Sequence, residues 1–288
     1  MTAPGVAGRP SPLKAVGWAL LYLATGFALM VVLAMVGLRL TGAAAGEPSV
    51  PRNLLIQTIA GLLAYGFLTW AIGFKALRLT PEDLRWKVDI GAGRGFGFGF
   101  ALGVSPAVLA LGLSVVLGGA SFLRDGGGIG SYLAQVTRTA LLLAPAALLE
   151  EIMFRGVAQV ALARAIGRWA AILVLSVAFA FAHLGNPNGT ALGLLNIALA
   201  GALLGVVFYT PGGLWAAWGA HLGWNITLAA LDAPVSGLPF RIPLIDYSPG
   251  GPVWLTGGRF GPEGGLLATV AITLATIAAW RWRGKELA

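Results

Sequence analysis

The sequence predicts an all-α protein, a polytopic bundle of about eight transmembrane helices. Of its 288 residues, 57% are hydrophobic and only 10% are charged, and the mean hydropathy is +0.82. Soluble domains carry about 25% charged residues, so this composition indicates an integral membrane protein. The chain has no cysteine, which excludes disulfides, thiolate metal sites and a cysteine nucleophile.

Apolar segments long enough to cross a bilayer follow one another along the chain. A helix needs about 20 apolar residues to span the hydrocarbon core. The candidates lie at about 15–38, 53–74, 92–118, 132–163, 169–184, 190–209, 213–231 and 264–281. Because the connections are short, a single membrane domain is expected over residues 1–288. The exception is 232–263, which is rich in proline and glycine and is expected to form an irregular, partly re-entrant loop.

The glycine-rich segment 91–103 allows two interpretations. Its glycines alternate with larger residues, which could suggest a strand, but Gly95, Gly99 and Gly103 also recur at a spacing of four. That spacing forms a small-residue face for close helix packing, and in a membrane-length apolar run the helix is favoured. The segment does not fit the G-x-G-x-x-G pattern and there is no P-loop, so the sequence gives no support for nucleotide binding.

The distribution of basic residues predicts the topology. The net charge is +8, but the basic side chains lie beside apolar segments, where they favour anionic lipid; no nucleic-acid partner is expected. By the positive-inside rule both termini are cytoplasmic, on the side of Lys14, Lys75, Arg78, Arg85, Lys87, Arg94, Arg164, Arg168, Arg281, Arg283 and Lys285. The opposite loops carry fewer, notably Arg52, Arg124, Arg241 and Arg259. A multi-pass protein of a prokaryotic plasma membrane is predicted.

Ionisable side chains inside the apolar segments are the most informative feature. The chain has two histidines, His183 and His221, and both lie in such segments, as do Glu150 and Glu151. Ionisable groups are costly in hydrocarbon, so they are rare there and usually functional. Two carboxylates with two imidazoles are typical of a proton-transfer or hydrolytic centre.

The two adjacent carboxylates have different predicted roles. Glu151 and Arg155 lie four positions apart with the acid first, the favoured orientation for an ion pair within a helix. Such a neutralised pair could serve only to let the helix insert, so a structural role is the simpler interpretation for both. Glu150 is turned about 100° from Glu151 and is free to face another helix.

The predicted depths of these groups in the membrane suggest that they lie close together. Glu150 lies fourteen positions before Arg164, and His183 lies fifteen after Arg168, so each is roughly 20 Å from the cytoplasmic rim. His221 follows the preceding glycine turn by only about a dozen ångström, which is shallower unless that turn is sunk into the protein.

Helical spacing also pairs each histidine with a neighbour. His221 and Asn225 are four positions apart and share one helix face, as do Phe179 and His183. Asn225 on its own would be interpreted as a group that hydrogen-bonds a neighbouring helix.

Three motifs, in this order, resemble those of the CPBP family of intramembrane proteases. That family includes the eukaryotic CAAX prenyl endopeptidase and bacterial bacteriocin-processing or immunity (Abi) proteins. Its motifs EExxxR, FxxxH and HxxxN/D are matched by Glu150-Glu151-Ile-Met-Phe-Arg155, Phe179-Ala-Phe-Ala-His183 and His221-Leu-Gly-Trp-Asn225. The resemblance covers a protease core of about 130–230; the first three helices and the last carry no recognised motif.

The resemblance implies a role for each motif residue. Glu150 would be the base that activates water together with His183, and His221 and Asn225 would hold the oxyanion. A histidine and an asparagine one turn apart can present two donors to one oxygen. The second glutamate and the arginine of the first motif, Glu151 and Arg155, would fix the helix that carries Glu150.

A metal site is the alternative that the residues leave open. Glu150, His183 and His221 could ligate zinc, and a zinc-bound water would be acidic enough to react near neutral pH. The HExxH pattern is absent, and the family has been described both as metal-dependent and as a glutamate-type peptidase. The metal-free version is slightly favoured, because three metal ligands and a separate general base would use up all of the candidate site residues.

The expected function is hydrolysis of a peptide bond in a membrane-associated protein or peptide, at a site reached from the cytoplasmic side. Prenylated CAAX substrates are less favoured in a prokaryote. The alternatives are a non-catalytic scaffold or immunity protein and a proton-coupled transporter, for which paired broken helices would be expected and are not seen. The sequence predicts neither the substrate nor the oligomeric state.

Overall fold

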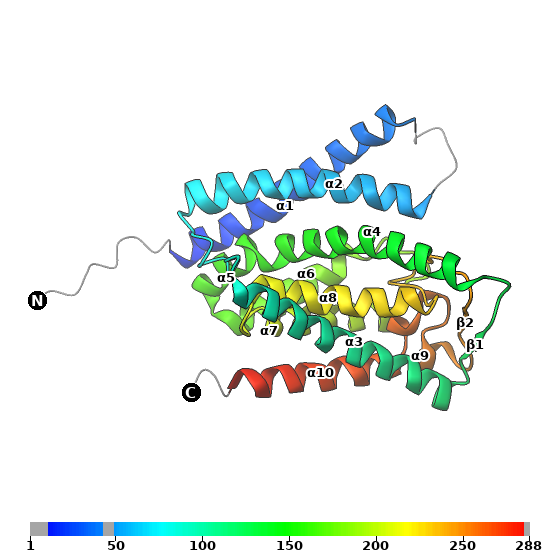
Figure 1. The fold of residues 1–288 in the computed structure, drawn as a ribbon. Helices are drawn as coiled ribbons and strands as arrows, with labels where there is room; N and C mark the ends of the chain where they lie inside the picture. Colours follow the sequence, from blue (N-terminus) through cyan, green and yellow to red (C-terminus); the bar gives the residue numbers. More distant parts are fainter. Residues whose placement is uncertain (1–10, 43–48, 285–288) are drawn as a thin grey trace, which may run out of the picture.

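The computed structural model describes residues 11–42 and 49–284, and it is an all-α bundle, as predicted. The long helices run back and forth along one axis (Figure 1): α1 (Pro12–Leu40), α2 (Val50–Leu68), α3 (Ile90–Gly118), α4 (Ile129–Arg155), α5 (Val157–Ile166), α6 (Arg168–Ala182), α7 (Ala191–Val207), α8 (Gly213–Ala230) and α10 (Leu266–Gly284). The minor elements are the π-helical turn η2 (Thr69–Ala76), the strands β1 (Ser121–Leu123) and β2 (Asp246–Ser248), and the short helices α9 (Val253–Thr256), η3 (Gly258–Phe260) and η4 (Pro262–Gly264).

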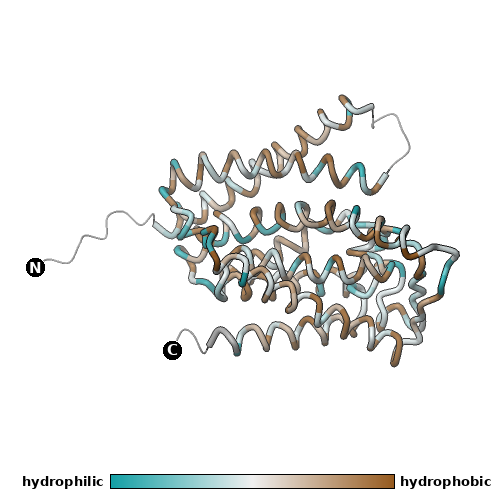
Figure 2. The backbone as a smooth tube through the Cα atoms, viewed as in Figure 1, coloured by the Kyte–Doolittle hydropathy of each residue, from teal (hydrophilic) through white to brown (hydrophobic). Residues whose placement is uncertain are grey.

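The outer surface of the bundle is suited to lipid. In the described part of the chain, three helices are long and apolar enough to cross a membrane: Pro12–Leu40, Val50–Ala76 and Ile90–Gly118. Apolar residues continue along the length of the helices in Figure 2, and many of the exposed ones are large, such as Leu63 and Leu141. Exposed apolar surface on this scale marks contact with a membrane rather than with water.

The chain enters and leaves the bundle at the same end. The start of α1 and the end of α10 lie at the same end of the bundle, whereas β1, β2 and α9 lie at the opposite end, called the loop end below (Figure 1). This arrangement agrees with an even number of crossings. Lys285, one of the basic residues used to predict the topology, lies outside the described residues.

Two predicted spans differ from the observed helices. The span 132–163 is two helices, because the backbone turns at Gly156 (φ −84°, ψ −126°) between α4 and α5. A side chain there would collide with the carbonyl of Ile152, so glycine permits the turn. The other difference is α6, which ends at Ala182, so His183 lies at the C-cap and not inside the helix.

The glycine-rich segment is a helix, and its small-residue face packs tightly, as predicted. A Cβ added at Gly99 would collide with the carbonyl of Ala216 in α8, and one at Gly103 with the carbonyl of Ala220. Gly95 meets the backbone of Gly212, in the turn before α8. That turn therefore lies level with the fifth residue after the start of α3, about 7 Å further into the bundle than the start of α3.

The long connection between α8 and α10 folds back into the bundle, as expected for a re-entrant loop. Glu263 accepts a hydrogen bond from Trp224 Nε1 (3.0 Å), and Trp224 is buried within α8. Asn196 of α7 donates to the carbonyls of Glu263 and Gly265 at 2.8 and 2.9 Å. This loop fills the space between α7, α8 and α10 near the motif residues.

Candidate active site

The structure brings Glu150 and both histidines together. The Nε2 atoms of His183 and His221 lie 3.7 and 3.8 Å from the same oxygen, Oε2 of Glu150. That oxygen is buried and accepts no hydrogen bond within the described residues. Three helices supply the three groups: α4 carries Glu150, the end of α6 carries His183, and α8 carries His221. The separations are too long for direct hydrogen bonds, so the carboxylate oxygen and the two ring nitrogens face one another without bonding directly.

The orientation of His183 is fixed by its own helix. Its Nδ1 lies 2.8 Å from the carbonyl oxygen of Phe179, and the two rings are 4.7 Å apart. Because a carbonyl only accepts, Nδ1 must carry the proton. The other ring nitrogen of a neutral His183 is then an acceptor that faces Glu150. The predicted shared face of Phe179 and His183 is therefore present.

Glu151 has a partner that the sequence did not indicate. Its Oε1 accepts from Arg155 Nη1 at 3.2 Å, which confirms the predicted pair, but it also lies 2.7 Å from Nδ1 of His221. Glu151 is fully buried. It thus links α4 to α8 and orients the second histidine, in addition to steadying its own helix.

Arg155 is the centre of a buried contact network. Its Nη2 donates to the carbonyl of Gly201 in α7 at 3.0 Å, and its guanidinium lies 4.7 Å from the ring centre of Phe179. Together with Glu151, it connects α4, α6, α7 and α8. These contacts close the site on the side nearer the chain termini.

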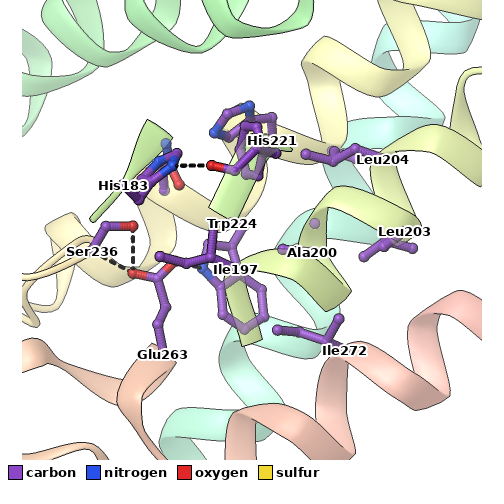
Figure 3. Close-up of a pocket in the computed structure, with 14 residues that line it drawn as sticks. His183, Ile197, Ala200, Leu203, Leu204, His221, Trp224, Ser236, Glu263 and Ile272 are labelled. Atoms are coloured by element: carbon purple, nitrogen blue, oxygen red, sulfur yellow. Dashed lines mark hydrogen bonds between the residues drawn. The ribbon is translucent and has the colours of Figure 1, made fainter. Parts of the chain in front are cut away.

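Asn225 and the two histidines form a wall between two cavities. The larger, about 220 Å³, is called the groove below, and contains Glu150. The smaller, about 40 Å³, lies behind the histidines and is mostly apolar (Figure 3); its lining includes Ile197, Ala200, Leu203, Leu204 and Ile272. Asn225, one turn beyond His221 on α8, lines both cavities, so its amide is accessible from the same space as the histidines.

Glu263 is a buried carboxylate near the site that sequence reasoning missed. Besides Trp224, it accepts from the backbone N–H of Ser236 and from Ser236 Oγ at 3.1 Å (Figure 3). Burial raises the pKa of its carboxyl, although these donors act in the opposite direction. It holds the re-entrant loop against α8. No motif marked it, because it lies in an irregular segment without helical periodicity.

The lining of the groove extends toward the loop end. Its lining includes Val235, Ser236, Leu238 and Phe240 of the re-entrant loop, together with Leu54 near the start of α2. All of these lie toward the loop end. If the termini are cytoplasmic, the groove opens away from the cytoplasm, and not toward it as the sequence reasoning expected.

The donor atoms of the site are of the types that bind zinc, but their arrangement does not fit a metal ion. Imidazole nitrogens and a carboxylate are donors that zinc prefers. Within residues 11–42 and 49–284, however, no group of three or more His, Asp or Glu side chains is arranged so that it could hold a metal ion.

Comparison with known families agrees with the motifs. A family model described as type II CAAX prenyl endopeptidase Rce1-like matches residues 132–227. This match supports the assignment of the motif-bearing segment to the CPBP family of proteases. The matched residues run from the first turn of α4 into α8 and so include every CPBP motif of the chain. No curated protein matches the chain.

Proposed function

We propose that this protein is an intramembrane endopeptidase that hydrolyses a peptide bond of a membrane-associated protein or peptide. One observation carries the proposal: two imidazole nitrogens, on His183 and His221, face one buried oxygen of Glu150 at 3.7 and 3.8 Å, and this oxygen accepts no hydrogen bond from the described residues. Polar atoms without hydrogen bonds are costly in a buried site. This carboxylate and the two imidazoles are therefore arranged to bind a water molecule and a substrate.

Glu150 and His183 would activate the water. A water that bridges Oε2 of Glu150 and Nε2 of His183 from one side would donate one hydrogen to each. As the water oxygen bonds to the peptide carbonyl carbon, Glu150 takes a proton. The same proton then passes to the leaving nitrogen as the C–N bond breaks, which restores the carboxylate.

His221 and Asn225 would stabilise the oxyanion. Because Nδ1 of His221 donates to Glu151, Nε2 can donate only when the ring is protonated. The Glu151 carboxylate favours that imidazolium, as a buried carboxylate does in other hydrolases. With Arg155 included, two carboxylates and two cations balance in charge, which suits a low-dielectric site.

The same geometry favours hydrolysis over transport. A transporter needs its central site to be reached from both sides of the membrane. Here the contacts among Glu151, Arg155 and Phe179 block one side. Among the described residues, the lining of the groove extends toward the other side.

The decisive experiment compares cleavage by wild type and Glu150→Gln. Purified protein in detergent is incubated with a library of internally quenched apolar peptides, and Glu82→Gln, an exposed glutamate in the loop before α3, serves as the matched control. We expect cleavage by wild type and the control, and none by Glu150→Gln. Equal cleavage by all three would refute the role of Glu150. A chelator arm tests the zinc alternative: loss of activity would assign Glu150, His183 and His221 as ligands.

A further inference from the structure

We infer that the face of α2 bordering the groove binds the backbone of an extended, apolar peptide segment that enters from the bilayer between α2 and α4. The inference rests on the proposed function, because it names how the substrate reaches Glu150. Its residues, however, lie outside the segment 132–227 that matches the protease family, and no motif assigned them a role.

The groove lies beside a close contact between the two helices. Gly61 of α2 lies against the side chain of Leu149 in α4, and a Cβ at Gly61 would collide with it. From that contact toward the loop end, Leu54, Gln57 and Thr58 of α2 line the groove. These three residues and Gly61 fall at spacings of three and four, so they form one face of the helix.

This face presents polar groups to the groove. Thr58 is 2% exposed, and its hydroxyl has no hydrogen-bond partner among the described residues. Gln57 beside it adds an amide that can both donate and accept. A buried hydroxyl without a partner destabilises the free protein. Its presence at the edge of a cavity that also contains Glu150 indicates a ligand that supplies the missing hydrogen bond.

A peptide backbone fits this requirement better than a lipid chain. Hydrocarbon tails can neither donate nor accept hydrogen bonds, whereas a peptide offers an N–H and a C=O at each residue. A helical segment would use those groups internally, so the bound peptide must be extended or unwound. Much of the remaining lining is apolar, including Phe27, Met30 and Leu143, which favours apolar side chains on the peptide.

The first test changes only the hydroxyl of Thr58. In Thr58→Val the shape is kept and the hydroxyl is lost, whereas Thr58→Ser keeps it. We expect Thr58→Val to raise KM for a cleaved library peptide about threefold to tenfold, the value of one hydrogen bond, with kcat nearly unchanged. Its melting temperature should rise, because an unpaired buried hydroxyl is removed. A higher melting temperature with an unchanged KM would overturn the inference.

The second test measures binding without cleavage. Because the chain has no cysteine, Thr58→Cys and the adjacent, 52% exposed Ile59→Cys give single-thiol proteins in a Glu150→Gln background. The probe is a bromoacetylated, leucine-rich peptide, with a bromoacetylated fatty acid in parallel. We expect the peptide to label Cys at position 58 at least tenfold faster than at 59, by intact mass.

The outcomes separate this inference from the proposed function. Equal labelling at positions 58 and 59, or labelling at 58 by the fatty acid as fast as by the peptide, would overturn the peptide-binding role while cleavage by wild type still supports the protease. Selective peptide labelling at position 58 together with no cleavage by wild type would support the peptide-binding role of the groove and contradict the proposed protease activity.

Discussion

Replacement of Arg155 by alanine tests whether the motif arginine is a structural residue or one that contacts substrate. Arg155 is 1% exposed and holds Glu151 at 3.2 Å and the carbonyl of Gly201 at 3.0 Å. Its removal leaves Glu151 with His221 as its remaining partner, at 2.7 Å. The expected effect is therefore on stability, and the geometry around Glu150 should be preserved in the molecules that fold.

The size of the effect follows from these contacts. Removing one member of a buried ion pair costs about 3–5 kcal/mol, and the lower end applies here because His221 still compensates Glu151. For a large domain each kilocalorie lowers the melting temperature by about 2–4 °C, so a loss of about 10 °C is expected. Arg155→Lys keeps the charge, but its single nitrogen replaces the two guanidinium nitrogens that donate to the two partners. Its melting temperature should fall between those of wild type and Arg155→Ala.

Thermal unfolding in detergent, followed by tryptophan fluorescence, measures the effect. The pH profile of cleavage should keep its shape in whatever fraction stays folded. A variant with normal melting temperature and no activity would refute the reasoning, because it would mean that Arg155 contacts the reacting atoms.

Three other predictions concern the site and its access. His183→Ala and His221→Ala should each nearly abolish cleavage, and the double variant should lose little more, because residues that act as a unit are non-additive; multiplicative losses would place them in separate sites. Single cysteines should show the side of access: a membrane-impermeant maleimide should label Ser248→Cys, at the loop end, on intact cells, and Lys75→Cys only after permeabilisation; the reverse pattern would mean that the groove opens to the cytoplasm. Asn225→Ala should lower kcat about 10²–10³-fold with little change in KM, and Asn225→Asp should be similarly poor; retained activity and bound metal in the aspartate variant would favour zinc ligation instead.

Contacts within one helix could be predicted from the sequence because their geometry is set by the helix itself. The pair of Glu151 with Arg155 and the shared face of Phe179 with His183 both follow from a spacing of four. The glycines of α3 follow from the same periodicity, since a small-residue face predicts a close neighbour. The identity of that neighbour, α8, did not follow.

Contacts between helices depend on how each helix is rotated, which spacing does not determine. Glu150 and Glu151 point about 100° apart, and the sequence suggested that only one of them faces the histidines. In the structure both reach His221, because its two ring nitrogens face opposite ways: Nε2 toward Glu150 and Nδ1 toward Glu151. An imidazole between two adjacent carboxylates can be recognised only once α8 is placed against α4.

The irregular segments were the least predictable part of the site. Glu263 lies in a one-turn 3-10 helix, and its partner Ser236 lies in the same long connection. No periodicity relates either residue to α8. The polar face of α2 was equally hidden, because Gln57 and Thr58 in an apolar helix are unremarkable until the groove beside them is known.

The depth of His221 shows how packing elsewhere in the bundle sets the site. Counted from its own turn, His221 seemed too shallow to meet Glu150 by about 8 Å. The backbone contact between Gly95 and Gly212 sinks that turn by about 7 Å relative to the start of α3, which accounts for nearly the whole difference. A methyl group at Gly95 would collide with Gly212, so the turn would have to move outward and carry α8, with His221 and Asn225, away from Glu150. The small-residue face of α3 lies outside the family motifs, and yet it places two of the motif residues at the depth where they meet the third.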